Sequence, residues 1–479
     1  MNPVRFILTI VLLSVITSVN AQKTIIQGCN QTYKGQEIKV FSCTDYISGT
    51  KTLVGSGLVD SLGNFKIDID IKTTCRLTMD LGRICGVLYA DTSMTYNIVL
   101  PDFRPKTKGD ILNPYFQPDE ILVGIKNPDR YNINMYVDMF DYTYEEYLAQ
   151  NYYMISASDR NYQKQFGKPV QTAVDSIINK IEQSFDTIPN EFFRTYREYK
   201  YAWLKFVSYM RDWRYMSREY FNDQPIAYEN PAYMDLFNQM FTNFLKFYMN
   251  TREGERIYSD IALAKSPVKA KQTLANSLAI TNDTLQEMVL LKGIHDALYD
   301  CYFTTSSLLI ALDSIKSTSK IQQHKQIAQN IEKKNNAVKV GTMAPEFCLA
   351  DTAGVFRSVD EYKGKYVYLN FVSIDNYTCV QDLEQLKLLN EKTKGVMDVV
   401  SISIDDDFDS VKKLFKRNGY NWTLLDVKGD KSVVDRYKVK VYPSYFLIDT
   451  DGTLCMSPAI SPSEDFESRF KQIFQKRQH

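Results

Sequence analysis

The 479-residue chain has no net charge and very little histidine. Its 57 lysines and arginines balance 57 acidic residues, and only three histidines are present. A chain without net charge has no overall field that would draw it to nucleic acid or to an anionic membrane. Zinc sites and Ser-His-Asp triads both use histidine side chains, and so few histidines make either kind of site improbable in this chain. We therefore expect no metal, no cofactor and no nucleic-acid partner.

Long apolar runs are also scarce, and the one that stands out lies at the N-terminus. A short basic stretch ending at Arg5 is followed by a nearly all-apolar segment, Phe6–Val19, and then by small residues. This order is typical of a secretory signal peptide over residues 1–21, with the mature chain beginning near Gln22. No later run approaches the roughly 18 apolar residues that a transmembrane helix needs. We therefore expect an exported protein whose mature chain has no transmembrane segment.

The chain has eight cysteines. In an oxidising compartment outside the cytosol, some of these thiols can pair. Four of them lie in the first hundred residues and allow three pairings, between which the sequence does not choose. That these cysteines are instead buried free thiols is an interpretation at least as good as a disulfide framework. These four are Cys29, Cys43, Cys75 and Cys85.

The spacing of apolar residues predicts a multidomain protein. Residues 22–100 are predicted to form an all-β, sandwich-like domain, because alternating runs such as Phe65–Ile71 are separated by turns. Residues 101–130 are rich in proline, aspartate and asparagine and are predicted to be a linker. Residues 131–336 carry apolar side chains at helical spacing, as in Val174–Phe185, and are predicted to be an all-α region. The other strands expected in the first segment are Lys23–Gly28, Gln36–Ser42, Thr52–Val59 and Tyr96–Leu100.

Capping residues and prolines suggest where some helices of the all-α region begin. One helix is expected over Asn190–Arg211 and another over Asn230–Tyr248, each opened by an asparagine near a proline. Thr284 has the position of a capping-box residue at the start of a further helix. His295 and His324 stand alone in the sequence, so each is interpreted as a surface or hydrogen-bonded histidine rather than a metal ligand.

The C-terminal segment, residues 338–476, alternates predicted strands and helices. Tyr366–Val372 has the length and aromatic content of a buried parallel strand. A short polar turn follows, and Cys379 then stands at the start of a helical pattern. The acidic run Asp405–Asp407 follows a second strand and is interpreted as a solvated helix start favoured by the helix dipole.

Several ordered motifs in this segment resemble those of a known superfamily. Gly341–Phe347 reads GTMAPEF and resembles the G-x-x-A-P-x-F entry of peroxiredoxins and secreted thioredoxin-like reductases. The strand, turn and helix around Cys379 come next, and Pro443 begins PSYFLID, which is similar to the family's P-x-x-F-L-I-D strand. Residues 338–476 thus resemble the thioredoxin-like superfamily, in its secreted TlpA-like and AhpC/TSA (redoxin) type. The resemblance implies an α/β thioredoxin fold and a location in the periplasm or cell envelope of a Gram-negative bacterium.

The redox motif of that superfamily is incomplete in this chain. The family has Cys-x-x-Cys at this turn, whereas the sequence reads Asn376-Tyr377-Thr378-Cys379. A carboxamide therefore stands at the position of the first thiol. Thiol–disulfide exchange begins with attack by a thiolate, and one cysteine alone cannot form the intramolecular disulfide of a dithiol cycle. Asn376 is instead suited to be the N-cap of the following helix.

The resemblance also implies a proline opposite this turn. In the family this proline is cis, and the residue before it offers backbone groups on which an extended peptide can add as a strand. The corresponding residues are Pro443 and Tyr442, and we expect a cis bond between them near Cys379. The candidate binding residues are therefore Asn376, Tyr377, Tyr442 and Pro443, and the candidate catalytic residue is Cys379.

The sequence leaves three readings of this site open. In the first, the protein has lost dithiol chemistry and binds a peptide or protein client at the Cys379 face, or acts as a scaffold. In the second, it is a thiol oxidoreductase or a peroxiredoxin-like enzyme that uses the single Cys379. The peroxiredoxin pattern then expects threonine and proline where Asn376 and Val372 stand. In the third, Cys379 is held in a disulfide with Cys348 or Cys455.

Overall fold

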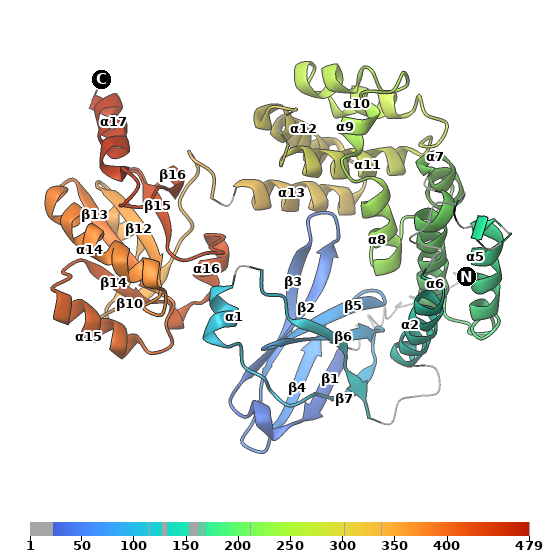
Figure 1. Cartoon of the computed structure of the whole chain (residues 1–479), viewed down its shortest axis with the longest axis horizontal. Helices are drawn as coiled ribbons and strands as arrows, with labels where there is room; N and C mark the ends of the chain where they lie inside the picture. The colour runs from blue at the N-terminus through green and yellow to red at the C-terminus, as the bar shows by residue number, and fades with distance from the viewer. Residues whose placement is uncertain are drawn as a thin grey trace, which may run out of the picture.

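A computed structural model describes residues 23–478, apart from positions 114, 127–131, 153–160, 162–163, 166, 168, 211, 301 and 337. The predicted signal peptide, residues 1–21, lies outside the described residues. Along the chain, two β-sheets are followed by a large helical region and a C-terminal α/β unit (Figure 1). Within the described residues, no helix combines the length and the apolar character required to cross a membrane.

The N-terminal part folds into two β-sheets of short strands. One sheet contains, in order, β4 (Asn64–Ile69), β1 (Thr24–Cys29), β7 (Thr95–Val99) and β9 (Gly124–Ile125). The other contains, in order, β3 (Thr50–Leu58), β2 (Glu37–Asp45), β5 (Cys75–Leu81), β6 (Ile84–Ala90) and β8 (Asp119–Leu122). Buried side chains of both sheets, among them Ile26, Ile67 and Leu77, form one core. The alternation of buried and exposed residues along β4 agrees with the period of two in its sequence.

The segment predicted to be a linker, residues 101–130, is partly built into these sheets. β8 pairs in parallel with β6, and β9 pairs antiparallel with β7. Before them comes the short helix α1 (Lys108–Leu112), which is opened by a capping box of Thr107 and Asp110. The described part of this segment therefore contains short ordered elements where the sequence predicts a linker. We refer to residues 101–126 as the connector.

The middle of the chain is helical, as its apolar spacing predicts. Its first elements are α2 (Ile133–Gln150), α5 (Val170–Glu182), α6 (Glu191–Lys205), the π-helix Phe206–Met210, α7 (Trp213–Ser217), the π-helix Arg218–Asn222, α8 (Pro231–Met240) and α9 (Phe244–Tyr248). Then follow the π-helix Ser259–Leu263, α10 (Pro267–Leu274), α11 (Asp283–Ala297), α12 (Thr305–Thr318) and α13 (Gln322–Asn336).

Two helix boundaries differ from the sequence prediction. The N-cap of α11 is Asn282, whose side chain accepts hydrogen bonds from the backbone N–H groups two and three residues later, so Thr284 is not the cap. The helix expected to begin after Asn230 and to run to position 248 ends at Met240. Asn243 then takes a left-handed conformation with a φ of 51°, which a continuous right-handed helix excludes.

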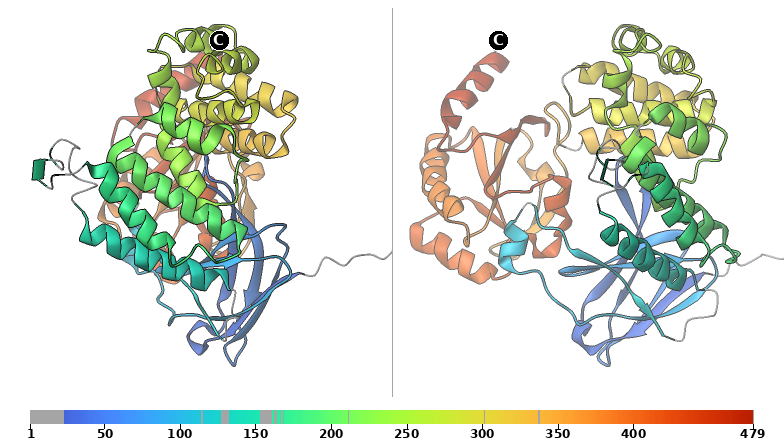
Figure 2. Two further views of the ribbon diagram at one scale, coloured as in Figure 1. Left: turned by 90° about the vertical axis from the view of Figure 1, so that its right-hand side faces the viewer. Right: turned by 45° about the vertical axis from the view of Figure 1, so that its right-hand side comes forward.

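The helical region shares a core with the second β-sheet. One hydrophobic cluster joins Val87 and Tyr89 of β6 to Val137 and Phe140 of α2. The Asn134 side chain also accepts from the backbone N–H of Tyr89 at 2.7 Å and donates to the backbone carbonyl of Tyr89 at 2.7 Å. Figure 2 shows the helices standing against the sheets from two further directions. The N-terminal sheets and the helices are thus one packed body.

The C-terminal unit is a mixed sheet covered by helices. The sheet order is β11 (Phe356–Ser358), β10 (Cys348–Asp351), β14 (Thr423–Asp426), β13 (Met397–Ser403), β12 (Tyr366–Val372), β15 (Ser444–Ile448) and β16 (Leu454–Ala459). The central strand β12 is parallel to β13 and antiparallel to β15, and all of its residues are buried. The covering helices are α14 (Tyr377–Lys392), α15 (Phe408–Asn418), α16 (Ser432–Arg436) and α17 (Phe466–Gln478).

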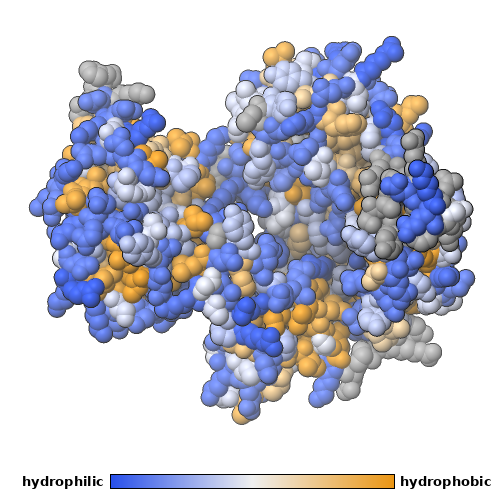
Figure 3. Space-filling view, viewed as in Figure 1, coloured by the Kyte–Doolittle hydropathy of each residue, from blue (hydrophilic) through white to orange (hydrophobic). Residues whose placement is uncertain are grey.

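The C-terminal unit lies at one end of the molecule, next to α1 of the connector (Figure 1). It meets the end of α13 through the Lys438 ammonium, which contacts the Lys334 backbone carbonyl. The Ser457 hydroxyl donates to the Val338 carbonyl at 2.5 Å. A notch separates this unit from the helical region on the visible face of the molecule (Figure 3).

Candidate functional site

The turn between β12 and α14 is held by an aspartate from the neighbouring strand. The hydroxyl of Ser373 donates to one carboxylate oxygen of Asp405 at 2.7 Å, and the backbone N–H of Ile374 donates to the other at 3.1 Å. Asp405 follows β13, which runs parallel to β12, so both segments leave the same edge of the sheet. The interpretation of the acidic run as a solvated helix start is therefore wrong for Asp405. It holds for Asp407, which is the N-cap of α15.

Asn376 is the N-cap of α14, as the sequence predicts. Its carboxamide oxygen accepts a hydrogen bond from the backbone N–H of Cys379 at 3.2 Å. Its carboxamide nitrogen donates to the backbone carbonyl of Tyr442 at 3.0 Å. One side chain thus stabilises the helix start and ties it to the loop that precedes β15. The position of the first thiol of the family motif is occupied by a bridging structural group.

Cys379 is buried beneath this turn. Its exposed fraction is 1%, and it packs in the core that α14 forms with β12. Burial, together with the negative charges of Asp382 and Asp405, raises the pKa of the Cys379 thiol to about 12. The thiol is therefore in its protonated form at pH 7. The thiolate is the reactive form, so both the burial and the raised pKa disfavour reaction at this cysteine.

The disulfide predicted as a third reading of the site is not formed. Cys379 is a free thiol, so it is bonded to neither Cys348 nor Cys455, and the Cys455 thiol instead donates to the Leu447 carbonyl at 3.4 Å. Free thiols are also found at each of the four cysteines of the N-terminal sheets, so none of the three pairings considered for them is present. Those four are Cys29, Cys43, Cys75 and Cys85.

The loop before β15 has the predicted backbone conformation. The peptide bond between Tyr442 and Pro443 is cis. The hydrogen bond from Asn376 to the Tyr442 carbonyl holds this loop next to the turn. The Tyr442 side chain is half-buried and packs against the cores on both sides of the sheet. Beside it, Val441 is 54% exposed, and Tyr377 at the start of α14 is 76% exposed. The structure therefore brings the predicted site residues together around a partly apolar surface.

Two charged residues of this region were not singled out from the sequence. Asp382 lies one helical turn after Cys379, is buried, and accepts a hydrogen bond from the Tyr445 hydroxyl at 2.6 Å. Lys108 of α1 forms an ion pair of 2.6 Å with Asp375, the residue before the N-cap. The helical spacing of Asp382 could have placed it near Cys379, but no sequence pattern joins residue 108 to residue 375.

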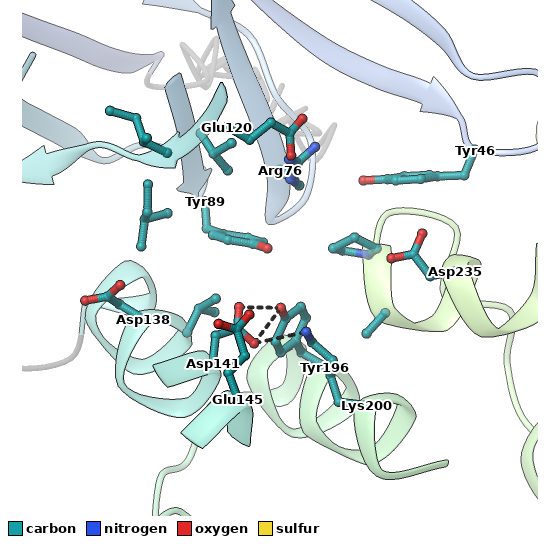
Figure 4. Close-up of a pocket in the computed structure, with 16 residues that line it drawn as sticks. Tyr46, Arg76, Tyr89, Glu120, Asp138, Asp141, Glu145, Tyr196, Lys200 and Asp235 are labelled. Atoms are coloured by element: carbon teal, nitrogen blue, oxygen red, sulfur yellow. Dashed lines mark hydrogen bonds and ion pairs between the residues drawn. The ribbon is translucent and has the colours of Figure 1, made fainter. Parts of the chain in front are cut away.

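A cavity of about 500 Å³, separate from this site, lies between the sheet that contains β5, β6 and β8 and the helices α2, α6 and α8 (Figure 4). Some of its polar groups are paired with one another. Arg76 pairs with Glu120 at 2.6 Å, and Asp141 accepts from the Tyr196 hydroxyl at 2.8 Å and faces Lys200 at 3.2 Å. This cavity contains none of the residues predicted for the site. Among the described residues, no group of three or more histidine, cysteine or acidic side chains is arranged to hold a metal ion.

Comparison with known proteins places the C-terminal unit in a defined class, the thioredoxin-like redoxins. A family model described as the AhpC/TSA family matches residues 340–456. The thiol-disulfide oxidoreductase ResA of Geobacillus kaustophilus is 30% identical over 172 residues, which are 35% of this chain and 93% of that protein. The ResA of Bacillus subtilis is 29% identical over 118 residues, 24% of this chain and 65% of that protein. The chain belongs to the AhpC/TSA family of thioredoxin-like proteins.

Solved structures that are similar to this chain cover less than a third of it. A thiol:disulfide interchange protein from a Bacteroides species has 21% sequence identity and a TM-score of 0.27, and the match covers 28% of this chain and 90% of that one. A thiol-disulfide oxidoreductase from Bacteroides fragilis has 19% identity and a TM-score of 0.25, with 28% of this chain and 99% of that one covered.

Proposed function

We propose that this chain is an exported thioredoxin-like protein that binds a peptide or protein client, or serves as a scaffold, without dithiol redox chemistry. The observation that carries the proposal is the double hydrogen bonding of Asn376. Its carboxamide stands at the nucleophile position and uses its oxygen to cap α14 and its nitrogen to hold the Tyr442 carbonyl. A group with this role contributes to the scaffold and supplies no electrons.

The state of the remaining cysteine supports the absence of a redox cycle. A dithiol cycle needs one thiolate that attacks and a second thiol that resolves the mixed disulfide. Cys379 is buried, its pKa is raised to about 12, and it forms no disulfide with Cys348 or Cys455, the cysteines considered as its partners. Neither half of the cycle has a suitable group at this turn.

The surface around the turn supports the binding of a client. Tyr377 at the start of α14 and Val441 in the cis-proline loop both contribute exposed apolar surface. In a soluble protein such surface often marks a site of interaction with another chain. The family uses the residue before the proline for strand addition, and here one acceptor site of the Tyr442 carbonyl is already taken by Asn376. A client would therefore be held more by side-chain contacts than by this backbone group.

The alternative is a thiol oxidoreductase or peroxiredoxin-like enzyme that uses Cys379 alone. In its favour, Cys379 occupies the position of the peroxidatic cysteine in the family frame. A peroxidatic thiol must, however, be accessible and have a low pKa. The burial of Cys379 and the direction of its pKa shift are the opposite of both requirements.

Two assays on the mature chain test the proposal. The first measures insulin reduction by the wild type and by Asn376→Cys, which restores a second thiol at the family spacing. We expect no activity above the dithiothreitol background for the wild type and a measurable gain for the variant. Wild-type activity comparable to that of an intact dithiol relative would refute the proposal.

The second assay measures binding of a fluorescein-labelled unfolded polypeptide with carboxymethylated cysteines, followed by fluorescence anisotropy. Tyr377→Ser should weaken binding, because it removes exposed aromatic surface at the site. Leu388→Ser is the matched control, since Leu388 is 53% exposed on the same helix but lies three turns further on. Absence of binding by the wild type would remove the client-binding part of the proposal.

A further inference from the structure

A cleft of about 800 Å³ lies between the C-terminal unit and the N-terminal sheets with their connector. Its size falls within the range of about 300–1,000 Å³ that is usual for ligand sites, which occur preferentially between domains. Tyr442, the residue before the cis-proline, forms part of its lining. The cleft is therefore continuous with the surface proposed above to receive a client.

Apolar side chains line the cleft on both sides. On the C-terminal side, Val427 belongs to the core of that unit, and the other apolar lining residues are partly buried and pack against this core. On the other side, the connector supplies an aromatic and aliphatic wall, with Phe103 packed on Tyr33 at a ring-centroid distance of 5.0 Å. The apolar lining consists of Tyr33, Ile38, Phe103, Ile111 and Phe116 on one side and Ile404, Val427, Val434, Val439 and Tyr442 on the other.

The charged groups at the cleft are mostly paired within their own side. Lys106 lies 3.9 Å from Asp80, and Lys431 lies 3.1 Å from Asp406. Asp110 is paired with Arg83 at 3.1 Å. Two of the three described lysines of the lining are thus paired, and Lys440 alone makes no cluster of cations for a phosphate or nucleotide. Its chemistry favours a neutral ligand with apolar side chains.

One buried polar group in the lining lacks a partner. Tyr33 is 1% exposed, and its hydroxyl forms no hydrogen bond with any described residue. A buried hydroxyl without a partner is unfavourable, because it has lost its bonds to water. The backbone carbonyl of a bound peptide would be a suitable acceptor for it. The group therefore indicates a ligand that brings hydrogen-bond acceptors along with apolar side chains.

We propose that this cleft holds an extended, apolar segment of the client polypeptide, with the connector and the N-terminal sheets forming a second wall opposite Tyr442. This inference rests on the proposed client-binding function and assigns it a groove made by two parts of the chain. The ion pair of 2.6 Å between Lys108 and Asp375 joins the two walls at one end of the site. An isolated thioredoxin-like unit would present only one of these walls.

The binding assay with the labelled unfolded polypeptide distinguishes this inference from the function on which it rests. Phe116→Ser and Ile111→Ser remove apolar surface from the connector wall and should each weaken binding about tenfold. Tyr33→Phe removes only the hydroxyl and should weaken binding about three- to tenfold without lowering thermal stability. Tyr115→Ser is the control, because Tyr115 is 86% exposed beside Phe116 and is not part of the lining. Circular dichroism verifies the fold of each variant.

The outcomes separate cleanly. If Tyr377→Ser weakens binding while the three wall variants bind like Tyr115→Ser, the client site exists but the second wall does not, and the inference is overturned. If the wild type does not bind the polypeptide at all, the client-binding part of the proposed function fails, and this inference fails with it. Weakened binding in the wall variants, with the control unchanged, supports the two-walled groove.

Discussion

The side chain of Asn376 should stabilise the C-terminal unit through two separable hydrogen bonds. Replacement of an asparagine N-cap by alanine typically costs about 1 kcal/mol. Loss of the bond to the Tyr442 carbonyl adds roughly 0.5–1.5 kcal/mol. Asn376→Ala should therefore lower the free energy of unfolding of this unit by about 1–3 kcal/mol. The two contributions can be told apart because only one of them needs an N–H donor.

Asn376→Asp is the matched variant for this purpose. Its carboxylate keeps an oxygen for the N–H of Cys379 and interacts favourably with the helix dipole, which contributes about 0.3–1 kcal/mol. It cannot donate to the Tyr442 carbonyl. We therefore expect Asn376→Asp to lie between the wild type and Asn376→Ala in stability at pH 7.

The C-terminal unit can be followed separately because Trp422 is the single tryptophan in residues 338–476. Urea unfolding is monitored by fluorescence in a background in which the two tryptophans of the helical region are replaced by phenylalanine. Hydrogen exchange of peptides from α14 serves as a local readout. Unchanged stability of Asn376→Ala, or equal losses in the alanine and aspartate variants, would refute the assignment of the two bonds.

Three further predictions follow from the burial and pairing of other side chains. Iodoacetamide should modify the exposed Cys348 readily in the native protein and leave Cys379 unmodified until the chain unfolds, as mass spectrometry of tryptic peptides would show; equal rates would contradict the burial. Burial alone would raise the pKa of Glu287, but hydrogen bonds from His324 and a nearby serine lower it from 4.5 to about 2. These hydrogen bonds should contribute about 3 kcal/mol to the free energy of unfolding. This contribution is fully present above pH 4.5 and is lost as the pH falls toward 2. Urea unfolding of Glu287→Gln at several pH values should lack this acid dependence. Finally, Lys108→Ala should leave the midpoint of thermal denaturation nearly unchanged, since exposed ion pairs contribute little to stability, and a clear drop in that midpoint would show that α1 is needed to hold the two walls.

The C-terminal fold could be predicted because local signals there agree with one another. The strand Tyr366–Val372, the helix Phe408–Asn418 and the asparagine cap at residue 376 are each visible in a few consecutive residues, and the structure contains all three. The order of the family motifs along the chain then predicts the fold, because each motif belongs to one particular strand, turn or helix of it. The absence of the first thiol of the family motif can likewise be read directly from residues 376–379.

Contacts between distant segments could not be predicted in the same way. β5 and β6 were missed because their residues are buried with little alternation, so the period of a half-exposed strand is absent. The pairing of β8 with β6 depends on a strand of four residues in a proline-rich stretch. The role of Asp405 depends on two parallel strands ending at one edge, which its own neighbours in the sequence do not reveal.

The most direct test of the central claim is a redox titration of every cysteine in the mature chain. The protein is equilibrated in glutathione buffers of graded potential, its free thiols are trapped by alkylation under denaturing conditions, and each cysteine is read by mass spectrometry. We predict that Cys379 stays a free thiol across the range in which an intact Cys-x-x-Cys relative becomes oxidised. Reversible formation of a disulfide between Cys379 and any other cysteine of the chain would contradict the account.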